Sequence, residues 1–185
     1  ALPQETGIML KLIKEVLRVG EATLAYPFEP IEVMPGFRGK PHHDPERCIA
    51  CAACAIACPP NALTMTTDLD QGIRTWSLFV GRCIYCGRCE EVCPTNAITL
   101  SPDFELAVMD KQDLFDRADY KLAACRICGV YFAPVKEIEY VCTVLEHSGL
   151  SDEYALNARG LLEVCPECKR KQDVRKMVRL HQEKD

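Results

Sequence analysis

Apolar residues recur at helical spacing in three stretches of the chain. The first is residues 9–19, MLKLIKEVLRV, whose charged residues fall opposite an apolar face of Met9, Leu12, Ile13, Val16 and Val19. This helix is too short to span a bilayer, so two placements stay open: packing on its own domain, or lying against a membrane subunit or the headgroup layer. Residues 1–8 show no periodicity and are predicted to lack regular structure.

The other two helical stretches lie toward the C-terminus. Residues 135–147, VKEIEYVCTVLEH, carry an apolar stripe of Ile138, Val141, Cys142 and Leu145. The tail from Lys169 onward combines basic residues with Val174, Met177, Val178 and Leu180. Both patterns predict amphipathic helices.

Alternating apolar and polar residues predict strands in the middle of the chain. In residues 62–82, ALTMTTDLDQGIRTWSLFVGR, two alternating runs flank the turn sequence DLDQG and predict a β-hairpin, with Trp76 as a packing residue. Residues 97–108, AITLSPDFELAV, are expected to form a matching strand pair. Residues 26–41 contain four prolines and are expected to run as extended chain over a surface.

The cysteine content changes this picture. The chain of 185 residues has enough hydrophobic residues, 48%, for a globular core, but its 13 cysteines exceed what core packing would use. No charged segment followed by a long apolar run opens the chain, so we expect no signal peptide and take the reducing cytosol as its compartment. Clustered thiols there indicate metal ligands. No stretch approaches the roughly 20 apolar residues that cross a bilayer.

Eight of the cysteines belong to two copies of one pattern. Residues 48–59 read CIACAACAIACP and residues 83–94 read CIYCGRCEEVCP, so each copy has the form C-x2-C-x2-C-x3-C-P. The 35-residue offset from Cys48 to Cys83 also pairs Arg47 with Arg82, and it pairs the Asn-Ala sequence at residues 61–62 with that at 96–97. We expect two halves about an approximate two-fold axis, each with a cysteine loop, a short helix and a strand.

This spacing is the bacterial ferredoxin pattern for a [4Fe-4S] cluster, and soft thiolates suit such clusters. Three cysteines in one tight loop can reach three irons of a cube, whereas the fourth lies past a turn and points to the other copy. We therefore predict one cluster on Cys48, Cys51, Cys54 and Cys93, and a second on Cys83, Cys86, Cys89 and Cys58. Two zinc sites are the alternative, but zinc knuckles rarely use this three-plus-one order.

Full ligation by four cysteines leaves no open iron for a substrate, so electron transfer is expected and the chain needs no catalytic site of its own. The first loop is lined by alanine, while the second carries Tyr85, Arg88, Glu90 and Glu91. The potentials of the two clusters therefore need not match. The sequence does not give the sign of their difference.

Four further cysteines form two distant C-x2-C pairs, which is the arrangement of a four-thiolate metal site: Cys125, Cys128, Cys165 and Cys168. Zinc is the favoured metal, and a single iron as in rubredoxin is the alternative. The leftover Cys142 is expected to be a buried core residue. The histidines have no ligand-like spacing to the cysteines, so none of them is assigned a role: His42, His43, His147 and His181.

A zinc knuckle beside a basic tail also fits nucleic-acid binding. Residues 169–179 contain six basic residues against one acidic residue. The whole chain, however, has a formal net charge of -5. We therefore expect no nucleic acid, and expect the basic face to be solvated or set against a partner subunit.

Several sequence elements, in this order, resemble the two-cluster ferredoxin subunits of respiratory complex I and of membrane-bound [NiFe] hydrogenases. These are Tyr26-Pro27-Phe28-Glu29-Pro30, Phe37-Arg38-Gly39-Lys40, the two cysteine runs and Phe104-Glu105-Leu106-Ala107. The resemblance covers roughly residues 9–115. It implies a subunit that bridges peripheral electron carriers to the subunit beside the membrane, with its N-terminal helix near the membrane surface.

The C-terminal third favours the hydrogenase branch, because complex I subunits of this type generally lack such a tail. The hydrogenase subunits of formate hydrogenlyase resemble it, including the run Cys-Pro-Glu-Cys-Lys-Arg at residues 165–170. The resemblance implies hydrogenase large and small subunits, a membrane subunit and a donor such as formate dehydrogenase or its ferredoxin-like partner. It also implies a place on the cytoplasmic face of the inner membrane. Complex I and a freely diffusing ferredoxin remain the alternatives.

Together these features predict an α+β protein in three parts. Residues 1–31 are the N-terminal extension and amphipathic helix, residues 32–110 the pseudo-two-fold 2[4Fe-4S] ferredoxin domain, and residues 111–185 the zinc-ribbon-like four-cysteine domain with a helical insertion. The predicted function is an electron relay through two [4Fe-4S] clusters to the [NiFe] site of a membrane-associated hydrogenase complex of the formate hydrogenlyase type.

Overall fold

The computed structural model describes residues 6–20, 23–148 and 158–182 of the chain. The chain divides into two compact units, residues 1–36 and residues 37–185, and each is described by itself. The described part contains no helix that is long and apolar enough to cross a membrane.

The first unit contains the predicted N-terminal helix, α1 (Thr6–Val19). The helix starts before Met9, so the prediction that residues 1–8 lack regular structure is wrong for residues 6–8, whereas residues 1–5 lie outside the described residues. Arg18 pairs with Glu15 one turn earlier. Within this unit the apolar side chains of Leu12, Ile13 and Val16 remain exposed.

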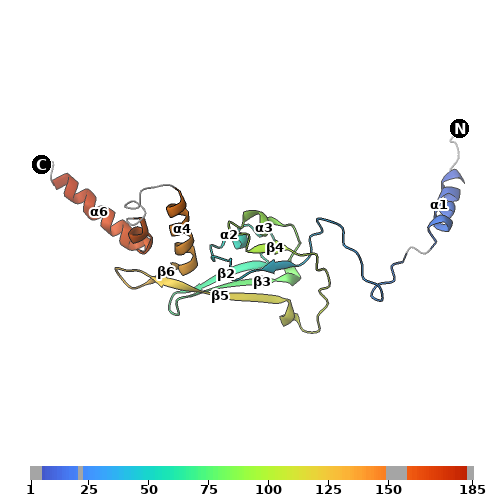
Figure 1. The fold of residues 1–185 in the computed structure, drawn as a ribbon, viewed down its shortest axis with the longest axis horizontal. Coiled ribbons are helices and arrows are strands. Elements are labelled where there is room, and N and C mark those ends of the chain that lie inside the picture. The colour runs from blue at the N-terminus through green and yellow to red at the C-terminus, as the bar shows by residue number, and fades with distance from the viewer. Residues whose placement is uncertain (1–5, 21–22, 149–157, 183–185) are drawn as a thin grey trace. The chain divides into compact units, whose positions relative to one another are not determined.

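The second unit consists of two small sheets with short helices around them (Figure 1). Its elements follow in the order β1 (Pro41–His43), α2 (Ala53–Ile56), β2 (Leu63–Asp68), β3 (Ile73–Phe79), η1 (Val80–Arg82), α3 (Arg88–Val92), β4 (Ile98–Leu100), η2 (Lys111–Leu114), β5 (Phe115–Ala124), β6 (Tyr131–Pro134), α4 (Val135–His147) and α6 (Pro166–Gln182). Residues 158–162 are also helical.

The predicted hairpin is confirmed as β2 and β3, which pair antiparallel from Leu63 opposite Leu78 to Asp68 opposite Ile73. The side chain of Asp68 accepts hydrogen bonds from the backbone N–H groups of Asp70 and Gln71 and so holds the turn. The sheet continues to β5 and β6, in the order β2-β3-β5-β6.

The strand pair predicted for residues 97–108 is wrong. Only residues 98–100 form a strand, β4, and it pairs with β1, with Pro41 opposite Leu100 and His43 opposite Ile98. The chain after β4 instead runs back along the segment before β1, where Gly39 N–H donates to Ser101 O at 2.8 Å and Lys40 N–H donates to Asp103 O at 2.7 Å. The partner of β4 therefore begins at Pro41, the last residue of the proline-rich stretch that we expected to be extended chain.

The two cysteine copies have matching backbones at the 35-residue offset. Strand β1 pairs with β4 in the same register as β3 with β2, since the pair His43–Ile98 becomes Leu78–Leu63 under that offset. A hydrogen bond next to each pair matches as well: Asp44 N–H donates to Ala97 O and Phe79 N–H donates to Ala62 O, both at 2.8 Å. Positive φ angles also recur in pairs: Ala50 and Tyr85, Ala52 and Gly87, Asn61 and Asn96. The duplicated sequence therefore folds twice into the same local structure.

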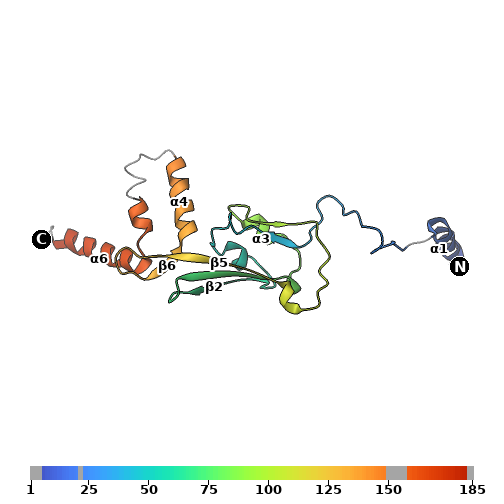
Figure 2. The same cartoon turned by 60° about the horizontal axis from the view of Figure 1, so that its bottom comes forward.

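The main core lies between the cysteine loops and the β2-β3-β5 sheet, on the face that carries α2 and α3 (Figures 1 and 2). Trp76 and Leu78 point inward from β3 and are almost fully buried, which confirms Trp76 as a packing residue. Ile98 and Tyr120 complete this core from β4 and β5. Burial of a side chain such as Leu78 contributes roughly 1.5–3 kcal/mol.

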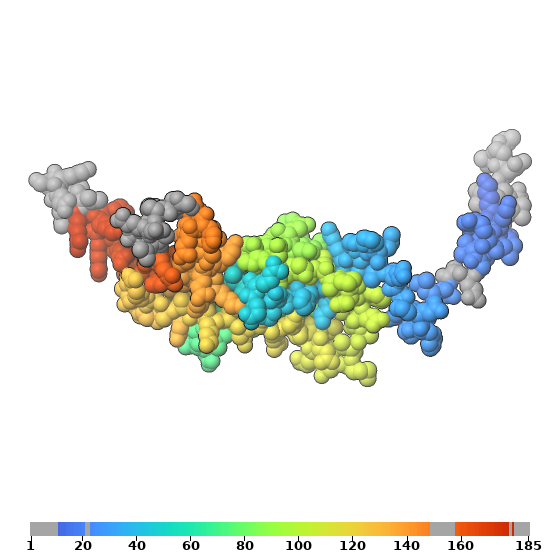
Figure 3. All heavy atoms as spheres, in the orientation of Figure 1, coloured from blue at the N-terminus to red at the C-terminus, as the bar shows by residue number. Residues whose placement is uncertain are grey.

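Helices α4 and α6 confirm the two predicted C-terminal helices. Cys142 is buried in α4, as expected. In Figure 3 the orange surface of α4 adjoins the cyan segment that carries the first cysteine loop. Lys136 of α4 donates to the carbonyls of Pro45 and Glu46 there, at 2.9 and 3.0 Å.

The backbone approach at Gly39 generates a stability prediction. A Cβ at this residue would lie 2.2 Å from Asp103 O and 2.7 Å from Ser101 O, so Gly39→Ala would force the two segments apart. We expect a loss of about 1–3 kcal/mol in the free energy of unfolding, measured by chemical denaturation. The matched control is Gly160→Ala in a helical segment, where the new Cβ has only ordinary contacts and should stabilise by about 0.5–1 kcal/mol. Equal stability of the two variants would contradict the prediction.

Candidate metal centres

The backbone of each cysteine loop curls so that its thiols converge. Ala50 and Ala52 in the first loop, and Tyr85 and Gly87 in the second, adopt left-handed φ angles of 54–82°. This conformation is unfavourable for residues with a Cβ, so it marks a loop that its surroundings hold tightly. In each loop, the N–H two residues after the first cysteine donates to the sulfur of that cysteine. Ala50 N–H donates to Cys48 Sγ and Tyr85 N–H donates to Cys83 Sγ, both at 3.4 Å.

The first pocket is lined by three cysteines of the first copy and one of the second: Cys48, Cys51, Cys54 and Cys93. It encloses about 350 Å³ of space outside the protein atoms. The other lining residues include Ala50, Trp76 and His43. These four cysteines are the set that the sequence grouped for one cluster.

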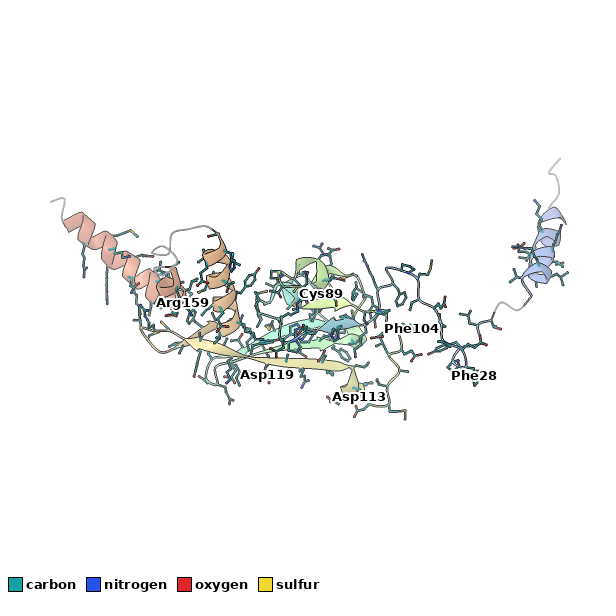
Figure 4. The ribbon with its side chains drawn as sticks, in the orientation of Figure 1. Phe28, Cys89, Phe104, Asp113, Asp119 and Arg159 are labelled. Atoms are coloured by element: carbon teal, nitrogen blue, oxygen red, sulfur yellow. The ribbon has the colours of Figure 1, made fainter. Side chains whose placement is uncertain are left out.

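The second pocket has the converse composition. Its cysteines are three from the second copy and one from the first: Cys83, Cys86, Cys89 and Cys58. It also encloses about 350 Å³. Cys89 is labelled in Figure 4, in α3. The fold therefore brings together both predicted sets of four cysteines, because Cys58 and Cys93 each line the pocket of the other copy. Ligation of a cluster by these cysteines stays a prediction.

Burial makes several of these thiols hard to ionise unless a cation is present. It raises the pKa of Cys54 and of Cys83, and it raises the pKa of Cys89 to about 11. At Cys93 burial also acts to raise the pKa, but backbone N–H groups outweigh it and the pKa is lowered; Ala97 N–H donates to its Sγ at 3.2 Å. A bound metal supplies the positive charge that lets buried thiols ionise together.

An unsatisfied donor shows that the first pocket fits a group with electron-rich sulfur. The indole N–H of Trp76 is buried and has no hydrogen-bond partner among the described residues. A buried donor without an acceptor costs free energy. Thiolate or sulfide sulfur in this pocket would give it an acceptor, so the residues present fit an iron–sulfur cluster.

The four C-terminal cysteines also meet in space, with their sulfur atoms all within 4.8 Å of one another. Cys125 and Cys128 lie in the turn between β5 and β6, where Gly129 N–H donates to Cys125 O at 2.8 Å. Cys165 and Cys168 lie at the start of α6, whose first residue is Pro166, a favoured residue at that position. No histidine joins the group in the part of the chain that the structure describes.

The electrostatics of this group favour a cation. Backbone N–H of Cys165, 3.3 Å from Cys125 Sγ, is the main cause that lowers the pKa of Cys125 to about 6. Burial and the neighbouring thiols raise the pKa of Cys168 to about 12. The pKa values of these two thiols thus move in opposite directions, and a bound cation would stabilise all four thiolates together. Four thiolates with tetrahedral reach suit zinc or a single iron.

Sequence reasoning missed two residues beside the first pocket. His43, which was assigned no role, lines that pocket and stacks on Trp76 with ring centroids 3.8 Å apart. Burial lowers its pKa, and its Nε2 lies 3.3 Å from the hydroxyl of Tyr120. Arg74, the other residue, donates from Nη1 to Ala50 O at 3.0 Å. Neither residue has the sequence spacing of a metal ligand. Their positions beside the pocket follow from the pairing of β1 with β4 and of β2 with β3, which the sequence alone did not predict in full.

Comparisons with protein families and with known sequences agree with a two-cluster site. The 4Fe-4S dicluster domain family matches residues 47–97. Formate hydrogenlyase subunit 6 of Escherichia coli (strain K12) is 51% identical over 162 residues, which is 88% of this chain and 89% of that protein. NADH-quinone oxidoreductase subunit I of Pseudomonas putida (strain KT2440) is 41% identical over 68 residues, 32% of this chain and 37% of that protein.

Among solved structures, a chain of the membrane-bound sulfane sulfur reductase, an archaeal respiratory membrane complex, is 23% identical. The match covers 82% of this chain and 74% of that chain, with a TM-score of 0.45. The match to subunit 6 has a higher identity and, at 162 residues, extends well beyond the dicluster domain. Because it covers most of both proteins, this chain belongs to the family of formate hydrogenlyase subunit 6, electron-transfer subunits with a 4Fe-4S dicluster domain.

Proposed function

We propose that the chain relays electrons through two [4Fe-4S] clusters, one in each cysteine pocket. The clusters supply one-electron redox chemistry, and the protein supplies their ligands and surroundings. The observation that carries the proposal is that each pocket collects four cysteines, three from one copy and one from the other. The matching hydrogen bonds of the two copies support the approximate two-fold relation between the halves.

We further propose that this relay serves a membrane-associated hydrogenase complex of the formate hydrogenlyase type. Electrons from formate oxidation would pass through the clusters toward the [NiFe] site, where protons are reduced. The partners would be hydrogenase large and small subunits, a membrane subunit and a formate dehydrogenase or its ferredoxin-like partner, on the cytoplasmic face of the inner membrane. The match to formate hydrogenlyase subunit 6 over most of the chain supports this over a complex I role.

The C-terminal four-cysteine group is proposed as a closed structural zinc site, which joins the β5–β6 turn to the start of α6. A single iron is the competing occupant. In the proposed division, residues 1–31 form the N-terminal extension and residues 32–110 the ferredoxin domain. Residues 111–185 form the four-cysteine domain, and their strand β5 pairs with β3 of the ferredoxin domain.

The crossed arrangement generates a prediction for single substitutions. Cys58→Ser should impair the cluster held by Cys83, Cys86 and Cys89 and leave the other cluster intact, because Cys58 lies in the second pocket. Iron content and cluster-resolved EPR of the purified chain measure this. Cys142→Ser is the matched control, because it removes a buried thiol outside both pockets and should leave both signals unchanged. Loss of the first cluster alone in Cys58→Ser would contradict the crossed assignment.

The C-terminal site generates a second prediction. The full chain should contain eight iron atoms and one zinc, and Cys168→Ser should lose the zinc while both clusters remain. Metal analysis by mass spectrometry, together with EPR, measures both metals on one sample. A ninth iron and no zinc would identify the site as a single-iron centre.

A further inference from the structure

The two pockets collect cysteines in the same three-plus-one pattern, but their linings differ at equivalent positions. Under the 35-residue offset, His43 and Trp76 of the first pocket correspond to Leu78 and Pro41 of the second. The first pair carries ring N–H groups and the second pair has no side-chain donor. A difference between the clusters would therefore come from these lining residues.

The indole of Trp76 is held so that its N–H stays in the first pocket. Its ring stacks on His43 with an interplanar angle of 14°, and His43 is itself bonded to the hydroxyl of Tyr120. This N–H has no partner among the described residues, so it is available to donate to sulfur of a group bound in the pocket. A donor to sulfur stabilises the more negative, reduced cluster.

An arginine beside the first loop acts in the same direction. Arg74, whose side chain is 19% exposed, donates to Ala50 O in the first loop and to Thr67 Oγ1 at 3.1 Å. Glu137 of α4 lies 4.0 Å from its guanidinium and offsets part of this charge. The second loop has an arginine too, since Arg38 donates to Cys86 O at 2.8 Å, but its side chain is exposed and its charge is screened by salt.

Acidic residues occur only at the second of the two short helices. Glu90 and Glu91 in α3 stand where α2 has Ala55 and Ile56. Arg88 lines the second pocket, but Glu91 pairs with it at 2.6 Å and offsets its charge. Glu90, next to Cys89 in the chain, has no such cation among the described residues and accepts a hydrogen bond from Leu100 N–H at 3.2 Å. A carboxylate beside Cys89 opposes the addition of an electron to the second cluster.

We propose that the cluster in the first pocket, on Cys48, Cys51, Cys54 and Cys93, has the higher reduction potential. This inference rests on the two-cluster function proposed above. Trp76 and Arg74 stabilise the reduced form of the first cluster, while Glu90 destabilises that of the second. An electron that enters the chain therefore resides preferentially in the first pocket.

The test is an EPR-monitored redox titration of the full chain with both clusters bound. We expect two distinct one-electron potentials. Trp76→Phe should lower the higher potential by about 59 mV, which is about tenfold in the equilibrium constant for one-electron reduction. It should leave the lower potential unchanged. Glu90→Gln, which keeps an acceptor for Leu100 N–H, should raise the lower potential and leave the higher one unchanged.

Two further variants keep the test decisive if Trp76→Phe disturbs packing. Arg74→Gln should also lower only the higher potential. Arg117→Gln is the matched control, because Arg117 lies over the Phe115 ring at 5.0 Å, and it should shift neither potential. These variants probe charge and hydrogen bonding separately from the shape of the core.

Equal potentials in the unmodified chain would overturn the inference, as would a shift of the lower potential by Trp76→Phe or Arg74→Gln. Unmoved potentials in all of the variants would also overturn it, while two intact cluster signals would still support the proposed relay. A chain that binds fewer than two clusters would instead overturn the proposed function itself. The two failures are therefore distinguishable from iron content and EPR alone.

Discussion

Both candidate cluster sites depend on the exchange of one cysteine between the two repeats. Cys58 lies in the pocket of the second copy and Cys93 in the pocket of the first, so metal bound in either pocket would link the two halves. The hydrophobic core is small, since only a few large side chains such as Trp76, Leu78 and Ile98 are fully buried among the described residues. Metal crosslinks would compensate for a core of this size, because binding free energy adds to folding free energy when the unfolded chain has no formed site.

A duplicated backbone with divergent side chains explains how one chain can hold two unlike clusters. The loops share their left-handed residues, their hydrogen bonds and their strand registers. Around this common frame, Trp76 and His43 face the first pocket, and Glu90 lies beside Cys89 of the second. In the proposed relay, the common frame would set the cluster type and the differing side chains would adjust the two potentials.

Local patterns predicted α1, the β2–β3 hairpin, α4 and α6, because helical stripes, alternation and turn residues are encoded over short distances. Spacing likewise predicted which cysteines share a pocket. Pairings between distant segments were not predictable in the same way: β4 pairs with β1, and β5 pairs with β3, because the partner of a strand is not encoded in its own residues. The roles of His43 and Arg74 depend on those pairings, so they appeared only in the structure.

The most direct test of the account is to purify the tagged chain from its native cells in mild detergent, identify the accompanying subunits by mass spectrometry, and count the metals on the released chain. The account predicts a [NiFe] hydrogenase large subunit and a formate dehydrogenase, with roughly eight cluster irons per chain. Recovery with flavin and quinone-site subunits, or recovery of the chain alone, would contradict it.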